Sequence, residues 1–155
     1  MKVKHSGLIV MMDNMQYFGN KRLPQKISYA ITKNLLNLTK HYSCYEQELE
    51  KILSFYGEHL ELDENGNKVI GEDGFPVIKD EELSEKMKQE IKDLLDIEVE
   101  IDMYQIDQEL LDYEDNDRYN PLTLNEILTL NSTIVRQDEE TEVDGEENAE
   151  EVESL

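Results

Sequence analysis

The sequence predicts an α+β fold: a long amphipathic helix and a shorter antiparallel helix forming a hairpin, with a small β-sheet and a disordered acidic C-terminal tail. Three observations predict this fold. A heptad pattern of apolar residues runs from about Ile27 to Tyr56, and a second apolar stripe with helical spacing follows at 80–96. Residues 97–103 then alternate between apolar and acidic side chains, which is typical of a half-buried strand.

The long helix carries apolar residues at steps of four and three from Ile31 onward, a heptad seam of more than three repeats. At ~1.5 Å per residue the helix spans roughly 45 Å. Pro24 suits its first turn, and Gly57 offers a place for it to stop. The part of the seam that we single out for partner binding or self-association consists of Leu38, Tyr42, Tyr45, Leu49, Ile52 and Tyr56.

Residues 7–12 (GLIVMM) precede the long helix and are rich in β-formers, so they predict a short buried strand closed by Asp13-Asn14. Two lysines before this run superficially resemble the start of a signal peptide, but the run is too short for one. No stretch approaches the ~20 apolar residues of a membrane span. We therefore expect a soluble protein of the cytoplasm, or of the host cytoplasm if phage-encoded, without membrane contact.

Two turn signals, Asn65-Gly66 and Asp73-Gly74, divide residues 62–79 into short β-prone pieces. They predict a small hairpin or a looped excursion at the end of the long helix, with Pro76 at an edge position. No internal repeat is evident from the sequence.

The second helix begins after Asp80, a suitable N-cap, and its lysines come late in the segment, which matches the helix dipole. It is long enough to cover only about half of the seam. The strand at 97–103 is expected to pair with residues 7–12. Thr123 and Glu126 form a capping-box pattern that predicts a short last helix.

The charge is strongly negative and unevenly distributed. The chain has 37 acidic and 15 basic residues, a net charge of −22, and ten of those acids fall in residues 138–155. That segment buries too little to offset its ordering entropy, so we expect a single domain over 1–137 and a disordered tail over 138–155. The negative electrostatic field of the chain favours a basic protein partner and disfavours nucleic acid. The basic residues nearest to a stripe are too few for direct nucleic-acid binding: Lys21, Arg22, Lys26 and Lys33.

Carboxylates gather around the predicted strand. They are Asp93, Asp96, Glu98, Glu100 and Asp102. Such a row could hold a divalent ion or act as paired acids, but a solvated face or a surface for a basic partner is the favoured interpretation.

The remaining chemistry-bearing residues do not assemble into a recognisable reaction centre. The stretch from Asp63 to Asn67 resembles the start of an EF-hand loop, but Lys68 stands where the motif needs glycine, so a plain turn is favoured. Cys44 is the single cysteine, which excludes an internal disulfide, and we expect it to be partly buried beside the seam. We therefore predict no metal, no cofactor, no catalytic residue and no enzymatic activity.

The order of features resembles a known family. A long tyrosine-bearing helix ends in YEQELEKILSFYGEHLELDENGNKVI, a further turn leads to FPVIKD, and EELSEKMKQEIKDLLDIEVEID follows. This arrangement resembles a family of tailed-phage proteins known as domain of unknown function 1617, over about Leu8 to Val135. The resemblance implies a small phage accessory protein that acts in the infected cell or during particle assembly, and it implies no catalytic residues.

Two functions follow as hypotheses. The first is a protein that binds a basic host or phage protein through its acidic surface and the uncovered half of the seam. For a phage product the natural case is inhibition of a host defence enzyme whose nucleic-acid groove is basic. The alternative is a morphogenesis or structural component that self-associates as a homo-oligomer through the long helix.

Overall fold

The computed structural model describes residues 1–114 and 116–137, so the predicted tail over 138–155 lies outside the described residues. The described part is a mixed α+β fold with four α-helices and a two-stranded antiparallel sheet, which confirms the predicted class. The elements are, in chain order, β1 (Lys2–Lys4), α1 (His5–Tyr17), the 3-10 turn η1 (Phe18–Asn20), α2 (Gln25–Phe55), η2 (Gly57–His59), α3 (Glu81–Leu95), β2 (Glu98–Glu100), η3 (Gln108–Leu111) and α4 (Leu124–Thr133).

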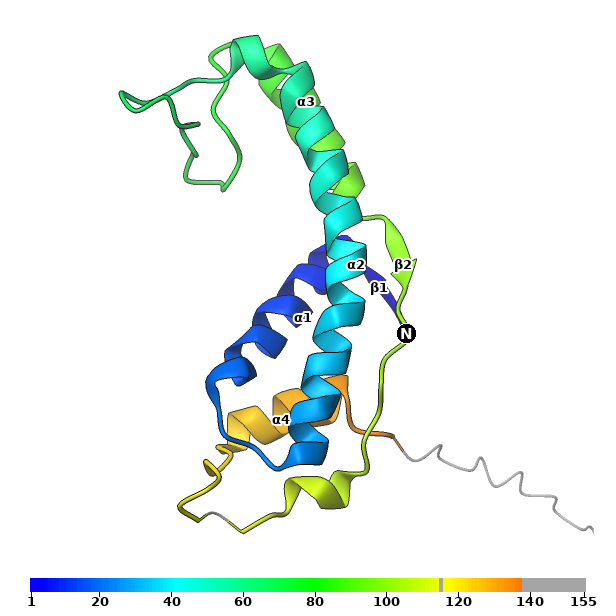
Figure 1. The fold of residues 1–155 in the computed structure, drawn as a ribbon. Coiled ribbons are helices and arrows are strands. Elements are labelled where there is room, and N and C mark those ends of the chain that lie inside the picture. Colours follow the sequence, from blue (N-terminus) through cyan, green and yellow to red (C-terminus); the bar gives the residue numbers. More distant parts are fainter. Residues whose placement is uncertain (115, 138–155) are drawn as a thin grey trace, which may run out of the picture.

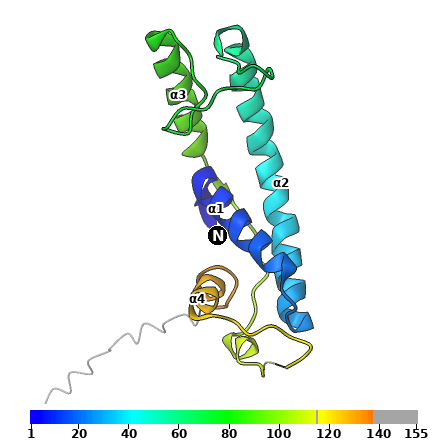
Figure 2. The same ribbon diagram turned by 90° about the vertical axis from the view of Figure 1, so that its left-hand side faces the viewer.

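Helix α2 is the axis of an elongated molecule, as Figures 1 and 2 show. Helix α1 packs against its first half and α3 runs antiparallel to its second half, while α4 lies in the half of the molecule where α2 begins. The long helix is confirmed at 31 residues, with Pro24 as its N-cap residue. The helical hairpin predicted for α2 and α3 is therefore present.

The strand predicted at residues 7–12 is wrong, because these residues lie within α1. The buried positions of α1 include Leu8, Met11, Met12 and Met15, which follow the i, i+3, i+4, i+7 spacing of a helix face. The β-branched Val10, which suggested a strand, is exposed on the opposite side. A continuous apolar run does not distinguish a strand from a helix by periodicity alone, and the buried Met15, which lies beyond the run, indicates the helix.

The strand predicted at 97–103 is present in shorter form as β2, but its partner is β1 instead of residues 7–12. The register is Lys2 opposite Glu100, Val3 opposite Val99 and Lys4 opposite Glu98. Side chains directly opposite each other lie on the same face of a sheet, so lysines face glutamates on one side and the two valines meet on the other. This charge and shape match explains the pairing.

The core is divided into two clusters along α2. The proximal cluster, around α1 and α4, contains Leu8, Met15, Ile27, Leu38, Ile101, Leu130 and Ile134 among its buried residues. The distal cluster lies between the end of α2 and α3, and its buried residues are Tyr56, Leu60, Ile78, Met87 and Ile91. Between the clusters His5, which is buried, lies against Tyr45 and its Nδ1 is 2.8 Å from the Leu94 carbonyl oxygen.

Two asparagines of α2 hold the chain segment that follows β2. The fully buried Asn34 donates from Nδ2 to the Tyr104 carbonyl (2.8 Å) and accepts from the Tyr104 N–H at Oδ1 (2.7 Å). Asn37, one turn further along, donates to the Asp102 carbonyl (2.9 Å). The segment thereby descends along α2 toward η3, as Figure 1 shows.

The predicted helix caps are confirmed. The Asp80 side chain accepts from the Leu83 N–H at the start of α3. Thr123 and Glu126 form a complete capping box at the start of α4.

Residues 60–79, which we call the distal knob, protrude from the end of the helical hairpin (Figure 1). The predicted turns are confirmed, since Gly66 and Gly74 have φ of 79° and 81°, values that favour glycine. Three short segments pair in a closed ring: the Glu61 N–H donates to Val77, Val77 to Val69, and Val69 to Glu61, at 2.9–3.0 Å. Three isolated β-bridges repeat the same geometry, Leu60 with Ile78, Leu62 with Lys68, and Ile70 with Pro76.

This ring reveals an internal repeat, although none was expected from the sequence. Aligned on the ring, the octets LELDENGN (60–67), KVIGEDGF (68–75) and PVIKDEEL (76–83) share an apolar third position and an acidic fifth position. The glycines that turn the first two octets occupy the same place in each. The third octet differs because it runs into α3 from Asp80 onward.

Candidate functional site

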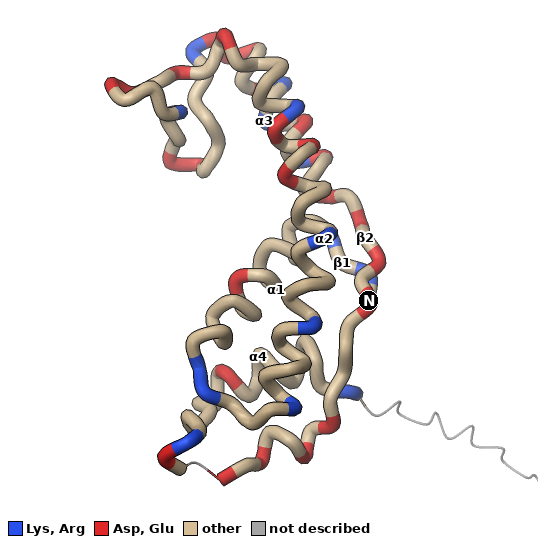
Figure 3. The backbone as a smooth tube through the Cα atoms, in the orientation of Figure 1, with Lys and Arg blue, Asp and Glu red and all other residues tan. Residues whose placement is uncertain are grey.

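All five carboxylates predicted to form an acidic face are exposed, at the end of α3, on β2 and just beyond it: Asp93, Asp96, Glu98, Glu100 and Asp102. Figure 3 shows acidic positions in red along α3 and β2. The sequence therefore placed these side chains on the surface correctly.

The acidic face is less negative than the sequence implied, because β1 brings positive charge to it. The Lys4 Nζ lies 3.4 Å from Asp96 Oδ1, and the terminal amino group lies 3.6 Å from Glu100 Oε1. Lys2 faces Glu100 across the sheet. The alternation Lys-Val-Lys at the start of the chain, complementary to Glu-Val-Glu, is the signal that could have predicted this pairing. A partner would meet mixed charge at this place.

The seam of α2 is covered within the chain, so the expectation that half of it is left open is wrong. Leu38, Tyr45 and Tyr56 are buried, and Tyr42, Leu49 and Ile52 are partly buried. Helix α1, predicted as a strand, covers the part that α3 does not reach. Self-association through these residues would have to displace α1 or α3.

The tyrosine hydroxyls of the seam reflect this packing. Burial raises the pKa of Tyr42, and the nearby Glu46 carboxylate raises it further. Burial also raises the pKa of Tyr56, together with its hydrogen bond to Glu90. These phenols are therefore neutral side chains of an intramolecular core at physiological pH.

The distal end of the molecule exposes apolar side chains among acids. Phe55, the last residue of α2, is 79% exposed, and Leu62 and Ile70 in the knob are 59% and 56% exposed. Leu62 and Ile70 occupy the same repeat position as Ile78, which is only 6% exposed because it packs into the distal cluster. We call the segments around Leu62, Ile70 and Ile78 the three apolar edges of the knob. The edge at Ile78 packs against the helices of the same chain, and the edges at Leu62 and Ile70 are exposed to solvent.

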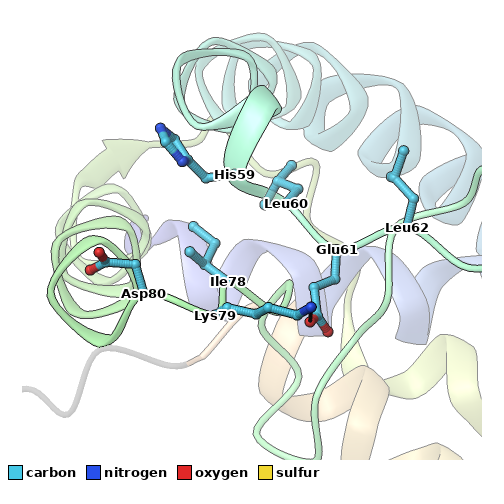
Figure 4. Close-up of a pocket in the computed structure, with 7 residues that line it drawn as sticks. All are labelled: His59, Leu60, Glu61, Leu62, Ile78, Lys79 and Asp80. Atoms are coloured by element: carbon cyan, nitrogen blue, oxygen red, sulfur yellow. Dashed lines mark ion pairs between the residues drawn. The ribbon is translucent and has the colours of Figure 1, made fainter.

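A hollow of about 560 Å³ lies where the knob joins the helices, and Figure 4 shows its lining. Leu60 and Ile78 lie side by side in it, while Leu62 stands apart from them. The Lys79 Nζ is 3.6 Å from Glu61 Oε1, an ion pair between the first and third octets. The hollow is thus part of the joint between the knob and the helical hairpin.

Polar contacts hold the knob in a defined position. The Lys88 ammonium on α3 lies 2.7 Å from Asp73 Oδ2, and its hydrogen bond lowers the pKa of the Asp73 carboxyl while raising that of Lys88. Lys88 and Lys92 also lie over the ring of Phe75, 6.0 and 5.9 Å from its centre. These contacts fix the knob against α3, and its exposed apolar residues therefore have a defined position relative to the helices.

The other sequence candidates take ordinary structural places. Asp63 Oδ1 accepts from the N–H groups of Asn65 and Asn67, which is the plain turn that was favoured over an EF-hand loop. Cys44 is exposed, so the expected partial burial is wrong.

Within residues 1–114 and 116–137 no three His, Cys, Asp or Glu side chains converge as a metal site would require. None of the helices described has both the length and the apolarity needed to cross a membrane.

Comparison of the chain with protein-family models, with curated proteins and with solved structures finds no match.

Proposed function

We propose that the chain is a protein-binding module whose distal knob docks on a basic protein partner. The observation that carries this proposal is the pair of exposed apolar side chains, Leu62 and Ile70, at positions equivalent to the buried Ile78. An apolar edge that is already used once inside the chain is a preformed docking element, and a second docking event would bury the other edges.

Charge determines which partner suits this surface. Residues 58–79 contain six acidic residues and two lysines, and the whole chain carries −22. A surface with apolar anchors surrounded by carboxylates is complementary to a basic surface that has an apolar pocket. For a product of the tailed-phage kind, we propose as the partner a host enzyme whose nucleic-acid groove is basic, and inhibition as the result of occupying that groove.

The proposal is tested by retention of host proteins on immobilised full-length chain, compared with two variants. L62S/I70S removes the apolar edges at exposed positions, and L124S/L128S makes the same change at two exposed leucines of α4. We expect the wild type and the α4 variant to retain the same basic protein and the knob variant to lose it. Retention should also weaken between 50 and 500 mM salt, since exposed charges are screened over about 10 Å at 0.1 M.

The same retained protein on all three baits would contradict the knob as the docking element. Retention that does not change with salt would contradict the electrostatic part of the proposal. Purification of the retained enzyme and assay of its activity with added chain then tests inhibition directly.

A further inference from the structure

A second hollow lies at the opposite end of the molecule, around the first turns of α2. It has a volume of about 640 Å³, within the range of small-ligand pockets. Its lining consists of Lys21, Arg22, Leu23, Gln25, Ser28, Tyr29, Thr32, Arg118 and Tyr119. Among the residues that the structure describes, no carboxylate lines this hollow.

The hollow is assembled by a clamp between segments far apart in the sequence. The Arg22 N–H donates to Asn120 Oδ1, and the Asn120 N–H donates to the Arg22 carbonyl, both at 2.7 Å. Asn116 Oδ1 accepts from the N–H groups of Arg118 and Tyr119, which turns this loop toward α2. The Arg118 guanidinium lies over the Tyr119 ring, 5.5 Å from its centre. The second arginine therefore comes from a loop, which is why the sequence showed too sparse a basic stripe.

The cations of the hollow differ in their availability. Lys21 is already bound to the buried carboxylate of Glu126, at 2.8 Å from Oε1. Among the described residues, no ion pair links a carboxylate to Arg22 or Arg118, and both side chains are exposed. Two guanidinium groups are thus free to bind an anion, and a guanidinium donates two parallel hydrogen bonds to phosphate oxygens.

Aromatic and hydroxyl groups complete the lining. Tyr29 is 55% exposed, and it lines both this hollow and a second one of about 470 Å³, which Lys26 and Tyr104 help to line. The rings of Tyr29 and Tyr104 are 5.4 Å apart in an edge-to-face arrangement. Ser28 and Thr32 lie on the same face of α2 as Tyr29 and add two hydroxyls. A planar ring could stack on a tyrosine while its phosphate reaches the arginines.

We propose that this hollow binds a nucleotide, with the phosphate at Arg22 and Arg118 and the base on Tyr29. An anion alone would use the arginines but not the tyrosine, and an apolar ligand would leave both guanidinium groups without a partner. A nucleotide uses both kinds of group. The ligand chemistry is the same for a free nucleotide and for one nucleotide of a single strand, which could also reach Tyr104 in the neighbouring hollow.

The test is calorimetric titration of the full chain with ADP, adenosine, inorganic phosphate, an eight-residue deoxythymidine oligonucleotide and an acidic peptide of eight glutamates. We expect ADP to bind at least tenfold more tightly than adenosine or phosphate. R22A and R118A should each weaken ADP binding about tenfold, the usual effect of losing one charged hydrogen-bonding group. Y29A should weaken it about tenfold through lost stacking, whereas Y29F should stay within about twofold.

K40A is the matched control, because Lys40 is an exposed cation of α2 that lines neither hollow. It removes the same charge and should leave ADP binding within about twofold. Circular dichroism of each variant checks that the fold is retained.

The outcomes separate the possible occupants. An oligonucleotide that binds at least tenfold more tightly than ADP, and that loses affinity in Y104A, identifies a single strand as the source of the nucleotide. Equal or weaker oligonucleotide binding identifies a free nucleotide. Phosphate or the glutamate peptide binding as tightly as ADP overturns the proposal, as does ADP binding that R22A and R118A leave unchanged or an absence of ADP binding to the wild type.

Discussion

The two hydrogen bonds between Asn34 and the Tyr104 backbone, which we call the Asn34 clamp, allow a quantitative test of what they contribute to stability. Asn37, a second asparagine of α2, serves as the comparison. Asn34 is 0% exposed and makes two hydrogen bonds to the Tyr104 backbone, at 2.7 and 2.8 Å. Asn37 is partly exposed and makes one bond, at 2.9 Å, to the Asp102 carbonyl. Both asparagines fasten the same segment to the same helix, so the two sites differ mainly in burial and in the number of hydrogen bonds.

We predict that N34A lowers the free energy of unfolding by about 2 kcal/mol. Two hydrogen bonds contribute about 1 to 1.5 kcal/mol each, and alanine returns roughly 0.5 kcal/mol through its higher helix propensity. N37A loses one solvent-accessible bond of about 0.5 kcal/mol, which the same propensity gain offsets, so we expect a change near zero. The comparison of the two variants removes the propensity effect, and the difference of about 2 kcal/mol measures the buried clamp.

Urea unfolding followed by circular dichroism at 222 nm measures both values by linear extrapolation. N34A and N37A within about 0.5 kcal/mol of each other would refute the reasoning, since the clamp would then not stabilise the fold. An unchanged slope of the unfolding transition is the control that both variants unfold from the same compact state.

Three further predictions concern other parts of the fold. G7A should destabilise the protein by about 1 kcal/mol despite the better helix propensity of alanine, because the added Cβ would lie 2.6 Å from Val3 Cγ2. In a V3A background the same change should become stabilising, and equal effects in both backgrounds would contradict the clash. M87A removes a fully buried side chain of the distal cluster and should lower the free energy of unfolding by about 2–5 kcal/mol. Amide hydrogen exchange should accelerate more in α3 than in α1, and an equal loss of protection in both helices would show that the two clusters open together. Burial raises the pKa of Glu126, but hydrogen bonds from Lys21 and Thr123 outweigh it and hold the folded-state pKa below the ordinary 4.5. The carboxylate therefore stabilises the fold fully above pH 4.5 and loses this effect as pH falls through the lowered pKa, so the stability difference between wild type and E126Q should shrink from pH 7 to pH 3, and a constant difference would contradict the assignment.

Much of the secondary structure was predictable because its signals are local. The seam of α2 repeats within each two turns, the caps of α3 and α4 act over three residues, and glycines mark the two turns of the knob. The failure at residues 7–12 had a local cause too. Five consecutive apolar residues, Leu8 to Met12, hide a helical face, and the evidence for that face lies at Met15, beyond the run.

The candidate sites were predictable only where exposure alone mattered. The acidic residues of β2 are on the surface as expected, but the lysines of β1 that partly neutralise them lie almost one hundred residues earlier in the chain. The equivalence of Leu62 and Ile70 to the buried Ile78 follows from the ring of hydrogen bonds that aligns the three octets of the knob. Arg118 joins Arg22 through the clamp at Asn120, for which the sequence carries no periodic signal.

The sequence by itself determined the long α2 axis, the antiparallel α3, the helix caps, the turns of the knob and the dominance of acidic residues. Each of these depends on side chains within a few turns of one another, where the geometry of helices and turns dictates the pattern. The tertiary structure decided that α1 covers the seam, that β1 pairs with β2, and that a hollow lined by basic residues forms at the other end of α2 from the knob. Those features arise from contacts between distant segments, whose choice depends on which surfaces match in shape and charge once the helices have packed.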